Sequence, residues 1–332
     1  MAAAKAPSMT ILDRALVWDN HACMPLRPDD ESFLPELRRL RDIGVNAVGL
    51  NIGFGGQGVE EHVRMLAHFR HWLKARPGEY LLIRTADDVL RAKESGRLGV
   101  FFDIEGANGI ADQLSLIELY YDLGVRWMLV AYNLNNRAGG GCLDEDPGLS
   151  EFGGRMIDEM NRVGMVLCCS HTGERTALEA IERSAAPVIF SHSNPRAVWD
   201  HPRNIRDNVI RACAQRGGVI GINGIGHFLG QGGNLSETLA RHVDYVAALA
   251  GIDHVAIGLD YVFDTQELIE YLRNNPELFG KDARSAETGF DSVAPEQLHD
   301  VVATLSKLGY SDEDLEKILG LNLLRIARTV WK

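Results

Sequence analysis

Eight short apolar segments, each about as long as a buried β-strand, recur along this 332-residue chain. Segments with helical spacing separate them, for example residues 33–43, 149–164 and 236–251. Near-continuous apolar runs are typical of parallel strands that are covered on both faces. The runs occupy residues 15–22, 45–53, 97–106, 126–133, 164–171, 187–193, 217–226 and 254–261. Eight such strands alternating with helices predict a (β/α)8 barrel, the TIM-barrel fold.

A closed barrel fits this chain better than an open, doubly wound sheet. No glycine-rich dinucleotide-binding fingerprint follows the first strand. No internal repeat, low-complexity tract or linker rich in Pro, Gly or Ser divides the sequence. We therefore expect residues 1–332 to form one catalytic barrel domain.

Turn signals support the predicted helix boundaries. Gly44, Gly124, Gly164 and Gly251 each follow a helical segment, where a residue with positive φ is favourable. Ser236 precedes a glutamate and is predicted to cap the N-terminus of its helix. Two long connections, at residues 137–148 and 263–292, are predicted to be loops on the functional face, the second with a short helix over residues 265–275.

The charge and the cysteine content narrow the range of partners and compartments. With 46 acidic and 34 basic residues the net charge is −12, which disfavours nucleic acid or an anionic membrane as the main partner. The first residues lack the apolar core of a signal peptide, and no apolar run reaches the roughly 18 residues of a membrane span. The five cysteines are too thinly spread for a disulfide-stapled secreted domain. We expect a cytoplasmic protein with reduced thiols that acts on a small molecule.

Side chains of the metal-binding types close five of the predicted strands: His21, Glu105, His171, His192 and Asp260. The active site of a β/α barrel forms at the C-terminal ends of its strands, so these side chains can share one mouth. Neutral imidazole and carboxylate groups suit zinc, and a carboxylate can bridge two ions. Any one of them alone is explained by a structural role, but five independent strand ends together predict a metal site.

The other histidines are expected to have structural or solvent-exposed positions. The spacing of His62, His68 and His71 within one helical segment does not match the H-E-x-x-H zinc motif, so we interpret them as solvated helix residues. Three others are assigned structural roles: His242, His254 and His299. His227 follows the seventh strand and can reach the mouth of the barrel.

Several motifs, in this order along nearly the whole chain, resemble the membrane dipeptidase (renal dipeptidase) family, peptidase family M19. They are EG at Glu105, SH at His171, FSHS around His192, HPRN around Arg203 and IGLDY around Asp260. The segments FGGRMIDEMNRVGM and LGLNLLRIAR follow the same pattern. The resemblance implies an amidohydrolase-like barrel and a metal-dependent hydrolase.

The resemblance also implies roles for the individual residues. It implies one or two zinc ions, with Glu105 bridging, His171 and His192 on one ion, and His21 near Asp260 on the other. Asp260 would in addition transfer protons during the attack of a metal-activated water on the amide.

The resemblance implies that Arg203 binds the terminal carboxylate of the substrate, a group that a guanidinium suits, whereas the sequence alone would favour a surface ion pair. Three departures mark the chain as a divergent member. Cys23 stands where the family's His-x-Asp motif has its aspartate, and it either binds zinc as a thiolate or is a buried thiol. Tyr132 replaces a histidine at the reaction centre; it can contact the substrate and donate to a developing oxyanion but cannot shuttle protons near neutral pH. Cys168 replaces an acid before the SH motif, which removes a group that would orient a ligand.

Three functions remain open from the sequence. The first is a zinc-dependent, dipeptidase-like hydrolase that cleaves an amide bond in a small carboxylate-bearing substrate such as a dipeptide. The second is a barrel amidohydrolase for an N-acyl amino acid, a lactam or a lactone, and the third is a catalytically silent, ligand-binding relative. The resemblance further implies a homodimer, although the sequence does not assign Trp72 and Leu73, which we expect to be exposed, to an interface.

Overall fold

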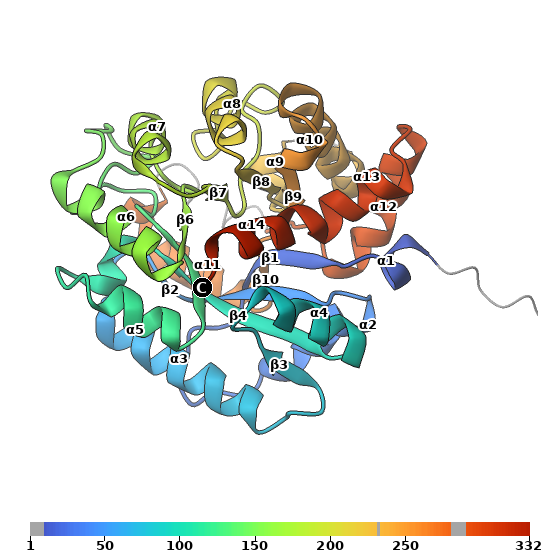
Figure 1. The fold of residues 1–332 in the computed structure, drawn as a ribbon, viewed down its shortest axis with the longest axis horizontal. Helices are drawn as coiled ribbons and strands as arrows, with labels where there is room; N and C mark the ends of the chain where they lie inside the picture. The colour runs from blue at the N-terminus through green and yellow to red at the C-terminus, as the bar shows by residue number, and fades with distance from the viewer. Residues whose placement is uncertain (1–9, 231–232, 280–289) are drawn as a thin grey trace, which may run out of the picture.

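A closed barrel of parallel strands forms the centre of the protein, with helices around it (Figure 1). The computed structural model describes residues 10–230, 233–279 and 290–332. The barrel strands are β1 (Trp18–Cys23), β2 (Ala47–Phe54), β4 (Leu98–Glu105), β5 (Val125–Leu129), β6 (Val166–Cys168), β7 (Ile189–Phe190), β8 (Val219–Ile222) and β9 (Val255–Ile257). They pair in this order, and the pairing of Asp19 in β1 with Ile257 in β9 closes the barrel. The predicted (β/α)8 fold is confirmed, with a strand overlapping each of the eight predicted segments.

Two further strands were not predicted as separate elements. β3 (Tyr80–Leu82) pairs with the first residues of β4, from Leu98 to Val100, before β4 begins to pair with β5. β10 (Tyr261–Val262) follows β9 after a break at Asp260 and pairs with the end of β1. The eighth barrel strand is therefore interrupted where the predicted site begins.

Helices fill the connections between the strands and follow the sequence pattern closely. They are α1 (Ile11–Arg14), α2 (Arg38–Asp42), α3 (Val59–Lys74), α4 (Ala86–Ser95), α5 (Leu116–Asp122), α6 (Glu151–Val163), α7 (Glu174–Arg183), α8 (Asp207–Gln215), α9 (Gly226–Leu229), α10 (Leu235–Ala250), α11 (Thr265–Asn274), α12 (Leu298–Lys307), α13 (Asp312–Glu316) and α14 (Asn322–Val330). The helix predicted after the eighth strand is α11, whereas residues 280–289 of that connection lie outside the described residues. Within the described ranges, no helix has both the length and the apolarity that crossing a membrane requires.

The predicted helix ends are largely correct. The four glycines expected after helices all have positive φ: Gly44, Gly124, Gly164 and Gly251. The capping prediction for Ser236 is wrong, because Asn234 caps α10 and its side chain accepts a hydrogen bond from the Ser236 amide. Ser236 is instead buried inside the first turn of the helix.

One end of the barrel is closed by α14, which lies across the ring of strands in Figure 1. Leu323 and Ile326 of this helix join a buried cluster with Trp18 and Trp127 from inside the barrel. The ring of Trp331, just after α14, packs 5.7 Å from that of Trp18. Because this end is filled by apolar side chains, a polar site can form only at the opposite end, where the strands terminate.

The inner face of α3 differs from the prediction. His62 and His68 are buried rather than solvated, because they lie on the helix face that packs towards the barrel. Trp72 and Leu73 are also buried, which excludes them from an exposed interface on this molecule. His71 is exposed as expected.

Candidate metal centre

All six side chains that the sequence nominated as metal ligands lie at the C-terminal end of the barrel: His21, Cys23, Glu105, His171, His192 and Asp260. The alternation of side chains along a strand explains how β4 contributes. Residues two apart point to the same side, so Phe101 packs in the filled interior while Glu105 reaches the open end. His171 and His192 lie within a few residues of the ends of β6 and β7, where the chain leaves the barrel.

The first cluster joins Glu105, His171 and His192. The Nε2 atoms of the two histidines lie 2.9 Å apart, and they are 3.5 and 3.2 Å from Oε1 of Glu105. All three side chains are buried, and this Oε1 atom has no hydrogen-bond partner among the described residues. A buried carboxylate oxygen that faces two imidazoles without a hydrogen bond is well placed to coordinate a cation.

Hydrogen bonds on the far side of the rings set which nitrogen faces this cluster. Asn133 donates from Nδ2 to the carbonyl of Leu278, so its Oδ1 is the atom that meets Nδ1 of His171 at 2.7 Å. His171 therefore carries its proton on Nδ1 and directs the lone pair of Nε2 inward. Burial lowers the pKa of His171 and of His192 well below the usual value, which keeps both rings neutral.

The second cluster joins His21, Cys23 and Asp260. Nε2 of His21 lies 3.4 Å from Oδ1 of Asp260 and 3.5 Å from the sulfur of Cys23, and this sulfur lies 3.5 Å from the same carboxylate oxygen. Nδ1 of His21 faces Asp103 at 3.3 Å, an arrangement in which a carboxylate orients a metal-binding imidazole. Glu105 lies 3.7 Å from His21 and so stands between the two clusters, as a bridging ligand would.

Burial makes the acidic groups of these clusters hold their protons more tightly than they would in water. Burial raises the pKa of Glu105 to about 8 and that of the Cys23 thiol to about 12. Burial alone would lower the pKa of His21, but the negative charges around it, that of Asp103 foremost, outweigh burial and raise it. A divalent cation would displace these protons, and the mixture of nitrogen, oxygen and sulfur donors fits such an ion.

Three residues of the site have a backbone conformation that is uncommon for residues other than glycine. His171, Asp260 and Asn133 have φ values of 59°, 56° and 57°. The left-handed region costs free energy for such residues, so the surrounding contacts must hold them there. The three residues are the candidate ligands His171 and Asp260, and Asn133, which is hydrogen-bonded to His171.

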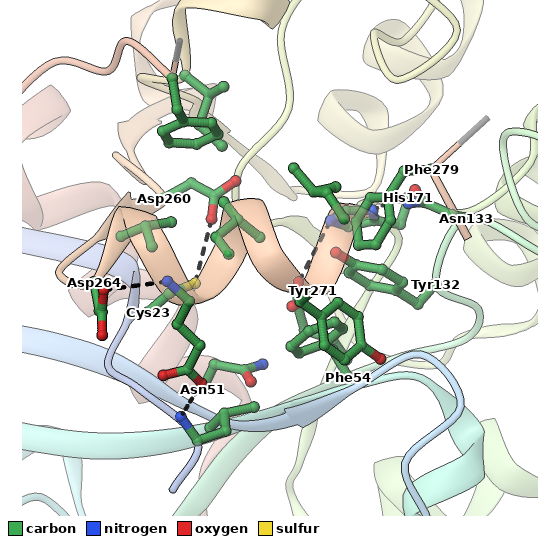
Figure 2. Close-up of a pocket in the computed structure, with 18 of the residues that line it drawn as sticks. Cys23, Asn51, Phe54, Tyr132, Asn133, His171, Asp260, Asp264, Tyr271 and Phe279 are labelled. Atoms are coloured by element: carbon green, nitrogen blue, oxygen red, sulfur yellow. Dashed lines mark hydrogen bonds and ion pairs between the residues drawn. The ribbon is translucent and has the colours of Figure 1, made fainter. Parts of the chain in front are cut away.

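A cavity of about 340 Å³ opens above both clusters and is lined by Cys23, Glu105, His171 and Asp260 (Figure 2). Tyr132 also lines it, and its ring stacks on His171 with the ring centres 4.1 Å apart. The structure therefore places Tyr132 beside the candidate metal ligands. His227 reaches the same cavity.

Arg203 enters the cavity from the connection between β7 and α8. Its guanidinium is buried and donates to the backbone carbonyl of His192 at 2.9 Å and to the hydroxyl of Ser193 at 3.2 Å. Its Nε atom has no partner among the described residues. The arginine is thus fixed beside the first cluster with a donor still to be satisfied.

Cys168 lies below the site rather than in it. It donates to the hydroxyl of Ser191 at 3.1 Å, and that hydroxyl contacts Nδ1 of His192 at 2.8 Å. The group that orients His192 is therefore Ser191, with Cys168 as its neighbour.

Several supporting residues escaped the sequence analysis. Asp103 contacts His21, Asn133 contacts His171, and Asn223 donates to Oδ2 of Asp260 at 2.9 Å. Asp103 could have been found, because it precedes Glu105 by two positions in one strand and must point to the same side. The two asparagines also follow strand ends, but a single asparagine in such a position is common in turns and gives no specific signal.

Known proteins share the sequence and the fold of this chain. The dipeptidase tcpJ of Claviceps purpurea is 33% identical over 250 residues, which are 74% of this chain and 54% of that protein. The chain thus spans about half the length of the first curated relatives it matches, at 54% and 56%. Among solved structures, an amidohydrolase from Pseudomonas aeruginosa is 25% identical with a TM-score of 0.88, covering 97% of this chain and 98% of that one.

A metallo peptidase from Rhodobacter sphaeroides, solved with a phosphinate mimic of the dipeptide L-Ala-D-Ala, shares the fold. Its TM-score is 0.78 at 20% identity, with 96% of this chain and 99% of that chain covered. The family model described as membrane dipeptidase (peptidase family M19) matches residues 54–332, a range that begins after the strand with His21 and Cys23. The chain belongs to the membrane dipeptidase family, peptidase family M19.

Proposed function

We propose that this protein is a metal-dependent hydrolase that cleaves an amide bond in a small, carboxylate-bearing substrate such as a dipeptide. The observation that carries the proposal is the convergence of three imidazoles on Oε1 of Glu105, at the floor of a cavity that also contains Arg203. Family membership supports it, as do the dipeptidase name of the Claviceps relative and the dipeptide mimic bound to the Rhodobacter enzyme.

The proposed metal is zinc, with one or two ions per chain. His171, His192 and Glu105 would hold the first ion, and His21, Asp260 and Cys23 would hold the second, with Glu105 shared. Neutral imidazoles, carboxylates and a thiol are the ligands that zinc takes in proteins. When bound, the metal would polarise the scissile carbonyl and lower the pKa of a water molecule.

The protein's own groups would bind and orient the substrate and move its proton. Arg203 is placed to bind the substrate carboxylate with its remaining donor, since it is already held in position by two hydrogen bonds. Asp260, oriented by Asn223, is proposed to pass a proton to the leaving nitrogen.

Tyr132 is proposed to act as a hydrogen-bond donor rather than as a base. Burial in the cavity, reinforced by the charges of Glu105 and Asp260, raises its pKa well above the usual value, so the phenol keeps its proton. Such a donor can stabilise the negative charge that develops on the substrate oxygen.

Two further proposals concern the whole protein. We propose a cytoplasmic location, which is supported by five cysteines that are all free thiols in the structure. We also propose a homodimer on the basis of the family resemblance, and light scattering of the purified protein would test it.

The enzymatic proposal is tested by removing and restoring the metal. Chelated protein should lose hydrolysis of a panel of dipeptides and acyl amino acids, and added zinc should restore it. The His171→Ala variant should lower kcat/KM at least about a hundredfold, because a ligand is lost, whereas His71→Ala, at an exposed position, should match the wild type. Zinc-loaded protein that turns over no amide would instead support the silent, ligand-binding alternative.

A further inference from the structure

Four aromatic side chains form one wall of the cavity above the metal centre. The ring of Phe54, the last residue of β2, has its centre 5.2 Å from that of Tyr132 and 5.0 Å from that of Tyr271 in α11. Phe279 meets both tyrosine rings edge-on, at 6.1 Å in each case. Figure 2 shows this aromatic wall on the side of the cavity where His171 lies. One part of the cavity is therefore suited to bury an apolar group.

Phe54 and Arg203 lie on opposite sides of the barrel mouth. Phe54 ends β2, whereas the guanidinium of Arg203 is hydrogen-bonded to His192 and Ser193, just beyond the end of β7. In the closed ring of β1, β2, β4, β5, β6, β7, β8 and β9, the strands β2 and β7 are four positions apart in either direction. The candidate metal ligands come from strands on both arcs between them, so a substrate bound at Arg203 reaches Phe54 only by crossing the metal centre.

This arrangement assigns the two halves of a dipeptide to different parts of the cavity. The carboxylate belongs to the C-terminal residue, and the scissile carbonyl belongs to the N-terminal residue. With the carboxylate at Arg203 and the carbonyl at the metal centre, the N-terminal residue extends towards Phe54. An apolar side chain on that residue would remove water from the aromatic wall, which is favourable roughly in proportion to the area buried.

The ammonium group of the same residue can meet a different part of the cavity. Asp264 and Glu267 line the cavity near the start of α11, and Arg27 pairs with both of them and with Asp30. Three carboxylates thus face one guanidinium, and the group keeps negative charge with which an ammonium can pair. In Figure 2, Asp264 lies apart from Phe54, which leaves the aromatic wall to the side chain of the substrate.

We propose that the enzyme selects dipeptides whose N-terminal residue has a large apolar or aromatic side chain, and that Phe54, Tyr271 and Phe279 are the residues that select it. This inference rests on the proposed function and specifies its substrate class. Hydrolysis breaks the amide C–N bond, adds the oxygen of water to the carbonyl carbon and gives a proton to the nitrogen. The products are a free apolar amino acid from the N-terminal half and the amino acid whose carboxylate was bound at Arg203.

The test compares three dipeptides on the zinc-loaded wild-type enzyme. Phenylalanyl-alanine and alanyl-alanine differ by one phenyl ring in the N-terminal residue, and alanyl-phenylalanine carries this ring in the C-terminal residue. Each is used with the L and with the D form of the C-terminal residue. Phenylalanyl-alanine should exceed the other two in kcat/KM at least about tenfold, because only its ring is buried against the aromatic wall.

Variants of the wall should reduce this preference. Phe54→Ala should lower the ratio of phenylalanyl-alanine to alanyl-alanine turnover about fivefold, because it removes an aromatic contact that only the larger substrate makes. Tyr271→Ala shortens the same wall from α11 and should lower the ratio in the same direction. The matched control is Phe33→Ala, because Phe33 is also half-buried but is not among the described residues that line the cavity, and the ratio should not change.

The outcomes separate the two proposals. If the wild type cleaves alanyl-alanine as well as phenylalanyl-alanine, the selection of an apolar N-terminal residue is wrong while the hydrolase proposal stands. If the preference exists but neither Phe54→Ala nor Tyr271→Ala reduces it, the aromatic wall is not the selecting surface. If no dipeptide is cleaved with zinc bound, both proposals fail.

Discussion

The replacement of a carboxylate by a thiol at Cys23 sets the character of the second cluster. Its sulfur lies 3.5 Å from both His21 Nε2 and Asp260 Oδ1, which is close enough for one cation to contact all three. Burial raises the pKa of the free thiol to about 12, so the thiolate would form only when a cation displaces the proton. The thiol therefore makes the ligands of the proposed second site softer than those of the first. This thiol becomes negatively charged only when a metal binds.

Cobalt substitution tests the role of Cys23. We predict that cobalt-loaded wild-type protein shows a sulfur-to-cobalt charge-transfer band in the near ultraviolet and that Cys23→Ser abolishes it. Cys142→Ser, which removes another half-buried thiol, should leave the band intact. A band that persists in Cys23→Ser, or one that is missing from fully loaded wild type, would show that Cys23 is a buried thiol and not a ligand.

At the scale of elements, the ends of the strands determine where the site residues lie. Gly258 lies between β9 and Asp260. Because it has no side chain, the backbone at the end of β7 can pack directly against it. A Cβ at this position would lie 1.9 Å from the carbonyl oxygen of Ser191 and 3.4 Å from Cα of His192. The glycine in the IGLDY motif is thus required for close packing beside a candidate ligand.

Gly258→Ala should therefore disturb both stability and metal binding. We expect a loss of roughly 1–3 kcal/mol in the free energy of unfolding, because backbone has to move to relieve the clash. Displacement of His192 should also weaken zinc binding at least about tenfold, as measured by competition with a chelator. Gly78→Ala, where a Cβ would meet no atom within 4 Å, is the control, and equal behaviour of the two variants would refute this role for Gly258.

The sequence predicted the elements, and the grouping of the candidate ligands at one end of the barrel, better than the contacts that support them. Strand ends carry a local signal, so His21, Glu105 and Asp260 could be identified without coordinates. The pairing of Arg27 with Glu267 could not, because it joins residues 240 positions apart through loop geometry. The sequence analysis also missed the burial of His62 and Trp72. Helical spacing shows which residues share a face, but polar and aromatic residues do not indicate which face packs against the barrel.

At the scale of the whole molecule, a buried histidine outside the site makes stability depend on pH. His242 of α10 is fully buried, and its Nε2 donates to the carbonyl of Leu229 at 2.9 Å. Burial lowers its pKa to about 4, below the reference value of 6.5. Between these values the unfolded chain binds a proton that the folded protein does not, so stability falls as the pH drops through this window.

Substitution of His242 should reduce this acid sensitivity. Between pH 7 and pH 5 the metal-free wild type should lose about 2 kcal/mol more than His242→Gln, which retains a donor for Leu229 but does not titrate. Urea denaturation of the two metal-free proteins at both pH values measures the difference. Parallel losses in the two proteins would mean that other groups cause the acid sensitivity.

The central claim is that metal binds at the mouth of the barrel, and anomalous X-ray scattering at the zinc edge tests it most directly. Crystals of zinc-loaded protein should show an anomalous peak in contact with Glu105, His171 and His192, and a second peak beside His21 and Asp260 if the second site is filled. The first peak should be absent from His192→Ala. Fully loaded crystals without a peak among these side chains would contradict the account.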